Sequence, residues 1–256
     1  MYQQIDYRDY LHNLDPNDSL ENIRFHLNKI NNLISVSEVE IFFEELINKK
    51  NWDEKTYDFF DALMYLVTDK FLAPCSMNSY YGQKNVPNTI DTKDAIWFDI
   101  TDYPNSNLDL LTNSNLKSLN ITNSKMKSIY LNNIVNIESI VLGHNRNLEK
   151  IEINPDLLRF IILTKCPKMN DFSVFYNSRN LFFADFSNNK NLKNIEFMEN
   201  FQNLLTLNLM NLNILDSPHT LEVLKELKNL KILFISANKE TLQLYREALP
   251  HCRVNK

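Results

Sequence analysis

The chain has 256 residues, of which 44% are apolar and 23% charged, so it can fold around one large core or two small ones and is not of the disordered class. Its formal net charge is −5, and residues 1–75 hold 14 acids against 7 lysines and arginines. This distribution argues against nucleic acid as a partner, because phosphates require a basic surface. It leaves an acidic face that would attract a basic protein.

The chain begins without a basic segment followed by an apolar run, and it contains no apolar stretch of about 18 residues. We therefore expect neither export nor membrane insertion. The cysteines Cys75, Cys166 and Cys252 are scattered and odd in number, which fits a reducing compartment better than a disulfide framework. Together these features predict a cytoplasmic protein.

Residues 1–75 have the spacing of amphipathic helices, because apolar residues recur every three or four positions in three runs. Pro74 ends the third run, and residues 76–93 form a polar linker. The first strand of a stacked sheet needs a cover, so we expect 1–75 to be an α-helical N-terminal cap subdomain for the domain at 94–256.

Within residues 94–256 one apolar pattern, LxxLxLxxN, returns seven times at spacings of 21, 21, 21, 23, 23 and 26 residues. Its fourth and sixth positions alternate with other residues as in a short strand. One copy buries too little apolar surface to fold alone, so the copies must stack and pair their strands into a parallel sheet. The copies start at Ala95, Leu116, Ile137, Leu158, Leu181, Leu204 and Leu230.

The ninth position of the pattern turns the chain out of the strand. Asparagine suits it because a side-chain amide can hydrogen-bond to the backbone of neighbouring copies, and cysteine or serine can do so more weakly. Glycine is almost absent, so we expect asparagine to occupy the tight turns as well. Five of the seven ninth positions hold such residues, Ser124, Asn145, Cys166, Asn189 and Asn238, and the other two are Tyr103 and Leu212.

The second half of each copy carries a weaker apolar echo, which we interpret as the return side of a coil. Only the last copies change character there. Ser217 and Pro218 predict a helix start, and Leu221, Leu224 and Leu227 follow with helical spacing. A second helix is predicted before Pro250, and the two helices would close the C-terminal end.

A fixed period of 20 to 29 residues with this pattern is typical of the leucine-rich repeat (LRR) family, and the chain resembles bacterial-type short repeats with an N-terminal helical cap. The resemblance implies an α/β fold, namely a leucine-rich repeat solenoid of about seven repeats with a parallel sheet on its concave face. It also implies a scaffold for binding, without naming the partner.

Residues between the repeated leucines should point to the concave face. There Val141, Phe160, Ile162 and Phe183 would form an apolar centre rimmed by polar side chains, as in binding hot spots. Two alternatives stay open: the chain's own return loops or N-terminal helices cover this patch, or the register is shifted by one residue. The predicted partner-binding residues are Trp97, Asp99, Val141, Phe160, Ile162, Phe183, Asp185, Asn208, Ile232 and Phe234.

The sequence lacks the motifs of a catalytic or metal site. No histidine has cysteine or carboxylate neighbours at ligand spacing, and no nucleophile elbow, phosphate loop or dinucleotide motif occurs. Alternating polar residues from Asp15 resemble a calcium loop, but Leu20 and His26 stand where glycine and glutamate are needed. We therefore expect no catalytic residue, metal, cofactor or small-molecule substrate.

These observations favour a non-catalytic protein that binds another protein. Within that class we favour a cytosolic bacterial inhibitor, an immunity protein that neutralises a partner toxin. One alternative is a secreted bacterial leucine-rich effector that binds a host protein, and another is a regulator of an intracellular enzyme. The sequence leaves open the identity of the partner, its contact with the N-terminal helices, and the oligomeric state.

Overall fold

The structure, a computed structural model, describes residues 89–90, 97–104, 106–110 and 116–256. The chain divides into two compact units, Met1–Ala73 and Pro74–Lys256, and the description below concerns the second. The predicted helical cap at 1–75 and most of the linker at 76–93 lie outside the described residues, so both stay predictions.

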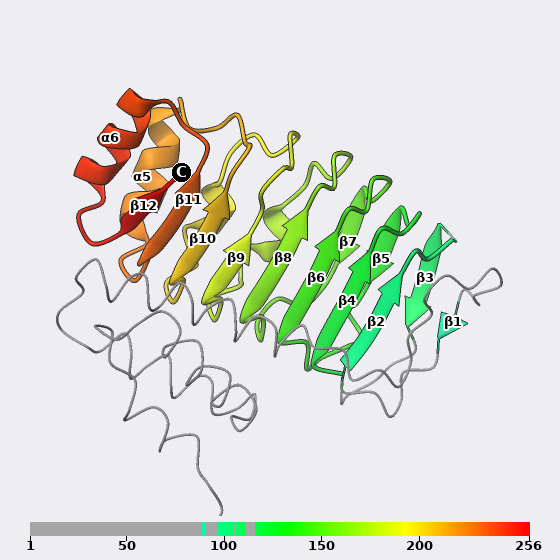
Figure 1. The fold of residues 1–256 in the computed structure, drawn as a ribbon. Helices are drawn as coiled ribbons and strands as arrows, with labels where there is room; N and C mark the ends of the chain where they lie inside the picture. Colours follow the sequence, from blue (N-terminus) through cyan, green and yellow to red (C-terminus); the bar gives the residue numbers. More distant parts are fainter. Residues whose placement is uncertain (1–88, 91–96, 105, 111–115) are drawn as a thin grey trace, which may run out of the picture. The chain divides into compact units, whose positions relative to one another are not determined.

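The main sheet has eight parallel strands that follow one another in chain order (Figure 1). This confirms the predicted parallel sheet, and each of the first seven strands lies in one copy of the repeated pattern. The eighth was not predicted. The strands are β2 (Trp97–Thr101), β4 (Ser118–Thr122), β6 (Ser139–Gly143), β8 (Phe160–Thr164), β9 (Phe183–Asp185), β10 (Thr206–Leu209), β11 (Ile232–Ile235) and β12 (Arg253–Asn255).

The return side of the coils changes along the chain. In the first coils it is a second parallel sheet of four short strands, then a 3-10 turn, and finally an α-helix. In chain order the elements are β1 (Thr89–Ile90), β3 (Asn107–Leu110), β5 (Ser128–Tyr130), β7 (Lys150–Glu152), η2 (Ser173–Phe175), η3 (Glu196–Met198), α5 (Pro218–Glu226) and α6 (Lys239–Ala248).

The spacing of the repeats explains this change. The three coils of 21 residues return as strands, the two of 23 residues as 3-10 turns, and the coil of 26 residues as a helix. A strand advances about 3.3 Å per residue, a 3-10 helix about 2.0 Å and an α-helix about 1.5 Å. A coil that crosses the same distance in a more compact conformation therefore needs more residues.

The two predicted C-terminal helices are present, with differences at their ends. Pro218 opens α5 as predicted, but the side chain of Ser217 makes no capping hydrogen bond. In α6 the cap is Asn238, whose side-chain oxygen accepts a hydrogen bond from the Thr241 amide at 2.8 Å. Asn238 thus caps a helix instead of bridging two coils.

Strand β12 follows α6 and pairs with β11. Arg246 of α6 donates from Nε and Nη2 to the carbonyl of Val254, both at 3.1 Å. The residue partner of Val254 on β11 is Leu233, while the Arg253 amide bonds back to Lys231. Successive residues in a strand point their backbone polar groups to opposite sides, so the Val254 carbonyl points away from β11. Arg246 therefore pairs a carbonyl on the outer edge of the sheet.

The core lies between the main sheet and the return side, and the repeated apolar positions form it. All of the consensus leucines and isoleucines from Leu116 to Leu233 are buried. The predicted register is therefore correct. In the coils with 3-10 returns, aromatic rings fill the wider interior, with ring centroids of Phe172, Phe186 and Phe197 within 5.5 to 6.1 Å of one another.

Buried asparagines at the ninth position connect neighbouring coils, as predicted. The Asn145 amide donates to the carbonyl of Ile121 at 2.8 Å. Asn189 donates to the carbonyl of Leu163 at 2.5 Å, and its oxygen accepts from the Cys166 amide at 2.9 Å. In its own coil Cys166 replaces the asparagine, and its thiol donates the equivalent hydrogen bond to the carbonyl of Leu142 at 3.3 Å.

Candidate functional site

The strands of the main sheet arrange their outward side chains in three rows, because parallel pairing places equivalent repeat positions beside each other. The first row comprises Ser118, Ser139, Phe160, Phe183, Thr206 and Ile232. The central row comprises Asn120, Val141, Ile162, Asp185, Asn208 and Phe234. The third row comprises Thr101, Thr122, Gly143, Thr164, Ser187, Met210 and Ser236.

The first row is almost entirely buried. Phe160 and Ile232 have 0% exposure although neither belongs to the core cluster, and Phe183 alone in this row is half-buried. The expectation that Phe160 faces solvent is therefore wrong. The physical reason is that alternation determines the face on which a side chain lies and does not determine what covers that face.

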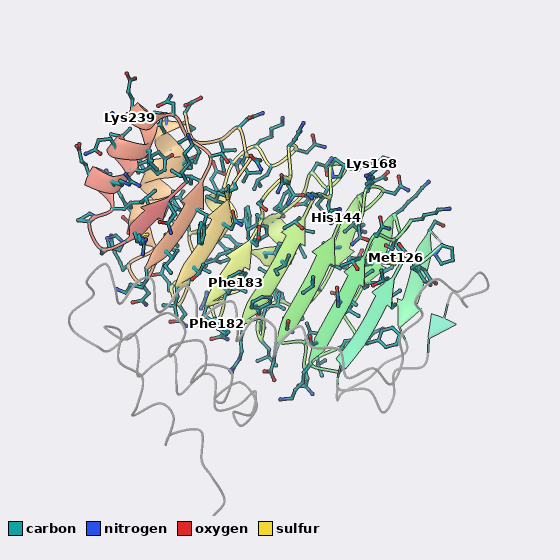
Figure 2. The ribbon with its side chains drawn as sticks, in the orientation of Figure 1. Met126, His144, Lys168, Phe182, Phe183 and Lys239 are labelled. Atoms are coloured by element: carbon teal, nitrogen blue, oxygen red, sulfur yellow. The ribbon has the colours of Figure 1, made fainter. Side chains whose placement is uncertain are left out.

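Phe160 and Phe183 are in direct contact, as predicted. Their rings stack with centroids 4.6 Å apart and an interplanar angle of 10°. Their strands pair so that the two residues are register partners. Figure 2 shows Phe183 near the start of β9, beside Phe182. The apolar centre thus exists as a packed pair, and its role in binding stays a proposal.

The central row is partly accessible, as is most of the third row. Ile162, Asp185, Asn208 and Phe234 are half-buried, and Val141 retains 8% exposure. These residues span β6 to β11, and neighbouring strands lie about 4.8 Å apart. The backbones of Trp97 and Asp99 lie in β2, but their side chains are outside the described part, so their membership in the site is a prediction.

Asp185 is the charged member of the described central row. Its Oδ1 accepts the Ser187 amide at 2.8 Å, and its Oδ2 accepts the Asn208 side-chain amide at 3.0 Å. Burial raises the pKa of this carboxyl, while the hydrogen bonds from Ser187 and Asn208 oppose the rise. Its neighbours at the same register on β8 and β10 are Ile162 and Asn208.

Three polar atoms of the outer face have no hydrogen-bond partner in the described structure. They are Oγ of Ser139, Oγ1 of Thr206 and Oδ1 of Asn120. Buried polar atoms are normally paired, because an unmade hydrogen bond costs about 1–3 kcal/mol. Of the three residues, Asn120 lies in the half-buried central row. All three oxygen atoms are themselves buried.

A polar edge follows the carboxyl ends of the strands. The residue at the eighth repeat position adopts a left-handed backbone, with φ between 53° and 63°, in six successive coils. Side chains join across the coils here, from Asn211 to Asn188 at 3.0 Å and from Lys165 to His144 at 3.3 Å. Figure 2 places His144 at this edge. The six residues are Asp102, Asn123, His144, Lys165, Asn188 and Asn211.

Sequence reasoning placed asparagine in tight turns but did not find this position. The signal was present at the eighth letter of the pattern, where three asparagines and one aspartate occur among six residues. These residues tolerate left-handed geometry better than most. Ala237 occupies the same position in the last coil, where the chain enters α6 and no positive φ occurs.

Two hollows lie away from the outer face. The larger, about 610 Å³, lies beside η2 and η3 and is lined by Tyr176, Glu196 and His219 among others. His219 contacts Glu196 at 3.2 Å and Glu222 at 3.4 Å. The smaller, about 410 Å³, lies between α5 and α6.

The described residues contain no group of three or more histidine, cysteine, aspartate or glutamate side chains placed to hold a metal ion. Burial raises the pKa of the Cys166 and Cys252 thiols to about 12, so neither has the lowered pKa of a nucleophilic cysteine. Both are free thiols. Of the helices in the described ranges, none has the length and apolar character that crossing a bilayer requires.

Comparison with known proteins gives a structural match only. No family model matches the chain, and no curated protein matches it. Eighteen chains of solved structures match. One is an internalin from Listeria monocytogenes, at 17% identity and a TM-score of 0.36. The alignment covers 62% of this chain and 66% of the internalin, just under two thirds of that protein's length.

Proposed function

We propose that this chain is a non-catalytic, protein-binding leucine-rich repeat protein, and that the concave face of its solenoid, the outer face of the main sheet, carries the contact. One observation supports this most directly. The central row holds half-buried apolar side chains, Ile162 and Phe234, together with the partly buried carboxylate of Asp185. Such a mixture of apolar and polar groups on one broad surface is typical of interfaces.

The dimensions of the face agree with a protein partner. The central row crosses six strands from β4 to β11, so it is roughly 24 Å long at about 4.8 Å per strand. A standard interface buries about 800 Å² on each partner, which a surface of this length can supply together with the third row. A small molecule would be better served by a deeper, enclosed pocket.

The test is capture of a partner followed by mapping. A protein retained by the full chain should bind the purified chain stoichiometrically. The captured protein should not bind the variants Ile162→Arg and Phe234→Arg, because each places a charge where a half-buried apolar side chain makes the contact. Val135→Arg is the matched control, since Val135 is 54% exposed and lies on the return side after β5. Equal loss in the control, or no loss in the face variants, would contradict the proposal.

Within this class we propose a cytosolic inhibitor that neutralises a bacterial toxin, which is supported by the acidic composition of the chain. The captured partner should then arrest growth when expressed alone and fail to do so when co-expressed with this chain. Fractionation of the native cell tests the location. A secreted effector is distinguished by fusing residues 1–50 to a reporter and measuring export; export would contradict the inhibitor.

A further inference from the structure

Asp185 occupies a repeat position at which an asparagine side chain can make the same hydrogen bond to the backbone. Its Oδ1 accepts the amide of Ser187, two residues further along the chain, at 2.8 Å. One strand away, Asn208 makes the equivalent bond, since its Oδ1 accepts the Met210 amide at 3.0 Å. Asparagine therefore fulfils the turn function at this repeat position. The turn bond can therefore form without a negative charge at this position.

This charge is also costly. Burial raises the pKa of the Asp185 carboxyl, which means that the folded environment disfavours the ionised form. Its strand neighbour on β8 is the apolar Ile162, and Phe183 precedes it on the same face of β9. Replacement of an isolated buried charge by a neutral amide would be favourable for folding, so the carboxylate requires another explanation.

One cluster of charged side chains beside this sheet is paired. Lys117 Nζ lies 2.8 Å from Oε1 of Glu138, and Arg159 Nε lies 3.9 Å from Oε2 of the same glutamate. In contrast, Asp185 forms no ion pair with any described lysine, arginine or histidine, and amide groups are its only hydrogen-bond donors apart from the Ser187 side chain. Among the described residues it is thus a carboxylate without a counter-charge, on a half-buried surface.

We propose that Asp185 is the anchor for an arginine side chain of the protein partner. A carboxylate offers about four acceptor positions, and the donors from Ser187 and Asn208 occupy three of them, which leaves one for a donor from outside the chain. A guanidinium can donate one charge-assisted hydrogen bond to that position. It is more weakly hydrated than an ammonium and packs well against apolar groups, here Ile162 and Phe183, so arginine fits this position better than lysine.

This inference rests on the proposed function and names the chemistry of the partner. It predicts that the partner carries a protruding basic residue with apolar neighbours. Asp185 adds the specific part, because its position in the central row fixes where the cation must lie.

Three peptides test it on the full chain: acetyl-Leu-Arg-Leu-amide, its lysine counterpart, and the form with citrulline, the neutral isostere of arginine. We expect the arginine peptide to bind at least about tenfold more tightly than the citrulline peptide. This is the difference expected from one hydrogen bond to a desolvated charge. Binding is measured by NMR titration, with the Asp185 carboxyl carbon as the local readout. Equal affinities for arginine and citrulline, or undetectable binding of the arginine peptide, would overturn the proposal.

Two variants locate the effect. Asp185→Asn removes the charge and should bring the arginine-to-citrulline ratio close to one. The double variant Asp185→Asn with Asn208→Asp keeps the net charge and restores the side-chain bond between the two positions in the opposite direction. It moves the carboxylate by one strand, about 4.8 Å. We expect this variant to lose the preference as well, whereas retention would mean that overall acidity and not Asp185 selects the cation.

The outcomes separate this inference from the proposed function. If Asp185→Asn leaves the peptide preference unchanged while Ile162→Arg abolishes partner capture, the sheet face binds a partner and the arginine anchor is wrong. If the preference disappears in both Asp185 variants, and their melting temperatures match that of the unmodified chain, the anchor is supported. A lysine peptide that binds as tightly as the arginine peptide would overturn the choice of guanidinium.

Discussion

The side-chain oxygen of Asn145 accepts two hydrogen bonds from Ser124, one from its amide at 2.9 Å and one from its hydroxyl at 2.7 Å. The same side chain donates to the carbonyl of Ile121 in the preceding coil. All of these groups are buried. One asparagine therefore pairs the polar groups of a neighbouring coil that water cannot reach.

Asn145→Ala should destabilise the chain by about 3 kcal/mol, because it leaves the Ile121 carbonyl and the Ser124 amide buried without partners, and each such group costs about 1–3 kcal/mol. Ser124→Ala removes only one hydroxyl bond and should cost about 1 kcal/mol. Urea unfolding measures both. The control is Asn133→Ala, at an exposed turn residue. A loss for Asn145→Ala no larger than that of the control would refute the bridging role.

Phe160→Ala should destabilise the fold by about 3–5 kcal/mol, which is comparable with Leu163→Ala, because both side chains are fully buried. A ring that faced solvent would instead contribute little, and its removal would leave melting nearly unchanged. Phe183→Ala should cost less, because its side chain is half-buried. Thermal and urea unfolding of the three variants decide between the two views. Near-native stability of Phe160→Ala would show that the ring contributes little where it lies.

The repeated pattern was sufficient to predict the parallel sheet and its register, while helical spacing and the prolines Pro218 and Pro250 predicted the two C-terminal helices. Leu163 and its equivalents recur at a fixed spacing, and only one stacking buries them all. β12 was not predicted, because its three residues are too few to show the alternation of a strand. The exposure of Phe160 could not be predicted, since alternation assigns a face while its cover depends on residues distant in the sequence.

Lys165 has a left-handed backbone with φ of 54°. The effect of a substitution there on stability should therefore depend on backbone strain more than on side-chain contacts. A β-branched residue tolerates this conformation poorly, so we expect Lys165→Val to cost about 1–2 kcal/mol. Lys165→Gly should be neutral or stabilise by up to about 1 kcal/mol, since relief of strain exceeds the added chain entropy. Urea unfolding of both variants provides the measurement.

Gly143→Ala is the contrasting control for that prediction. Gly143 has no positive φ, and an added Cβ would lie 3.4 Å from Thr122 Cγ2 and 3.7 Å from Thr164 Oγ1, which are ordinary contacts. Alanine there should leave stability unchanged or raise it by about 0.5–1 kcal/mol. A marked loss would show that the space above Gly143 is occupied, and would weaken the comparison with Lys165.

The raised pKa of Asp185 gives a pH dependence of known sign. The folded state holds this proton more tightly than the unfolded chain, whose carboxyl has the ordinary value of 3.8. Between the two pKa values the folded state binds more protons, so the contribution of Asp185 to stability falls as pH rises from the unfolded through the folded pKa. Above the folded pKa the penalty is constant. Its register neighbours Ile162 and Asn208 do not titrate, so they do not obscure the effect.

The measurement is the free energy of unfolding of the unmodified chain minus that of Asp185→Asn, followed from acid to neutral pH. This difference should become less favourable to the unmodified chain as pH rises above the ordinary carboxyl value, and then level off. The bond from Asn208 favours the ionised carboxyl and therefore reduces the slope, but burial is the larger effect and sets the sign. A difference that rises with pH would mean that the folded state stabilises the ionised form, and that a cation from the chain itself already compensates Asp185.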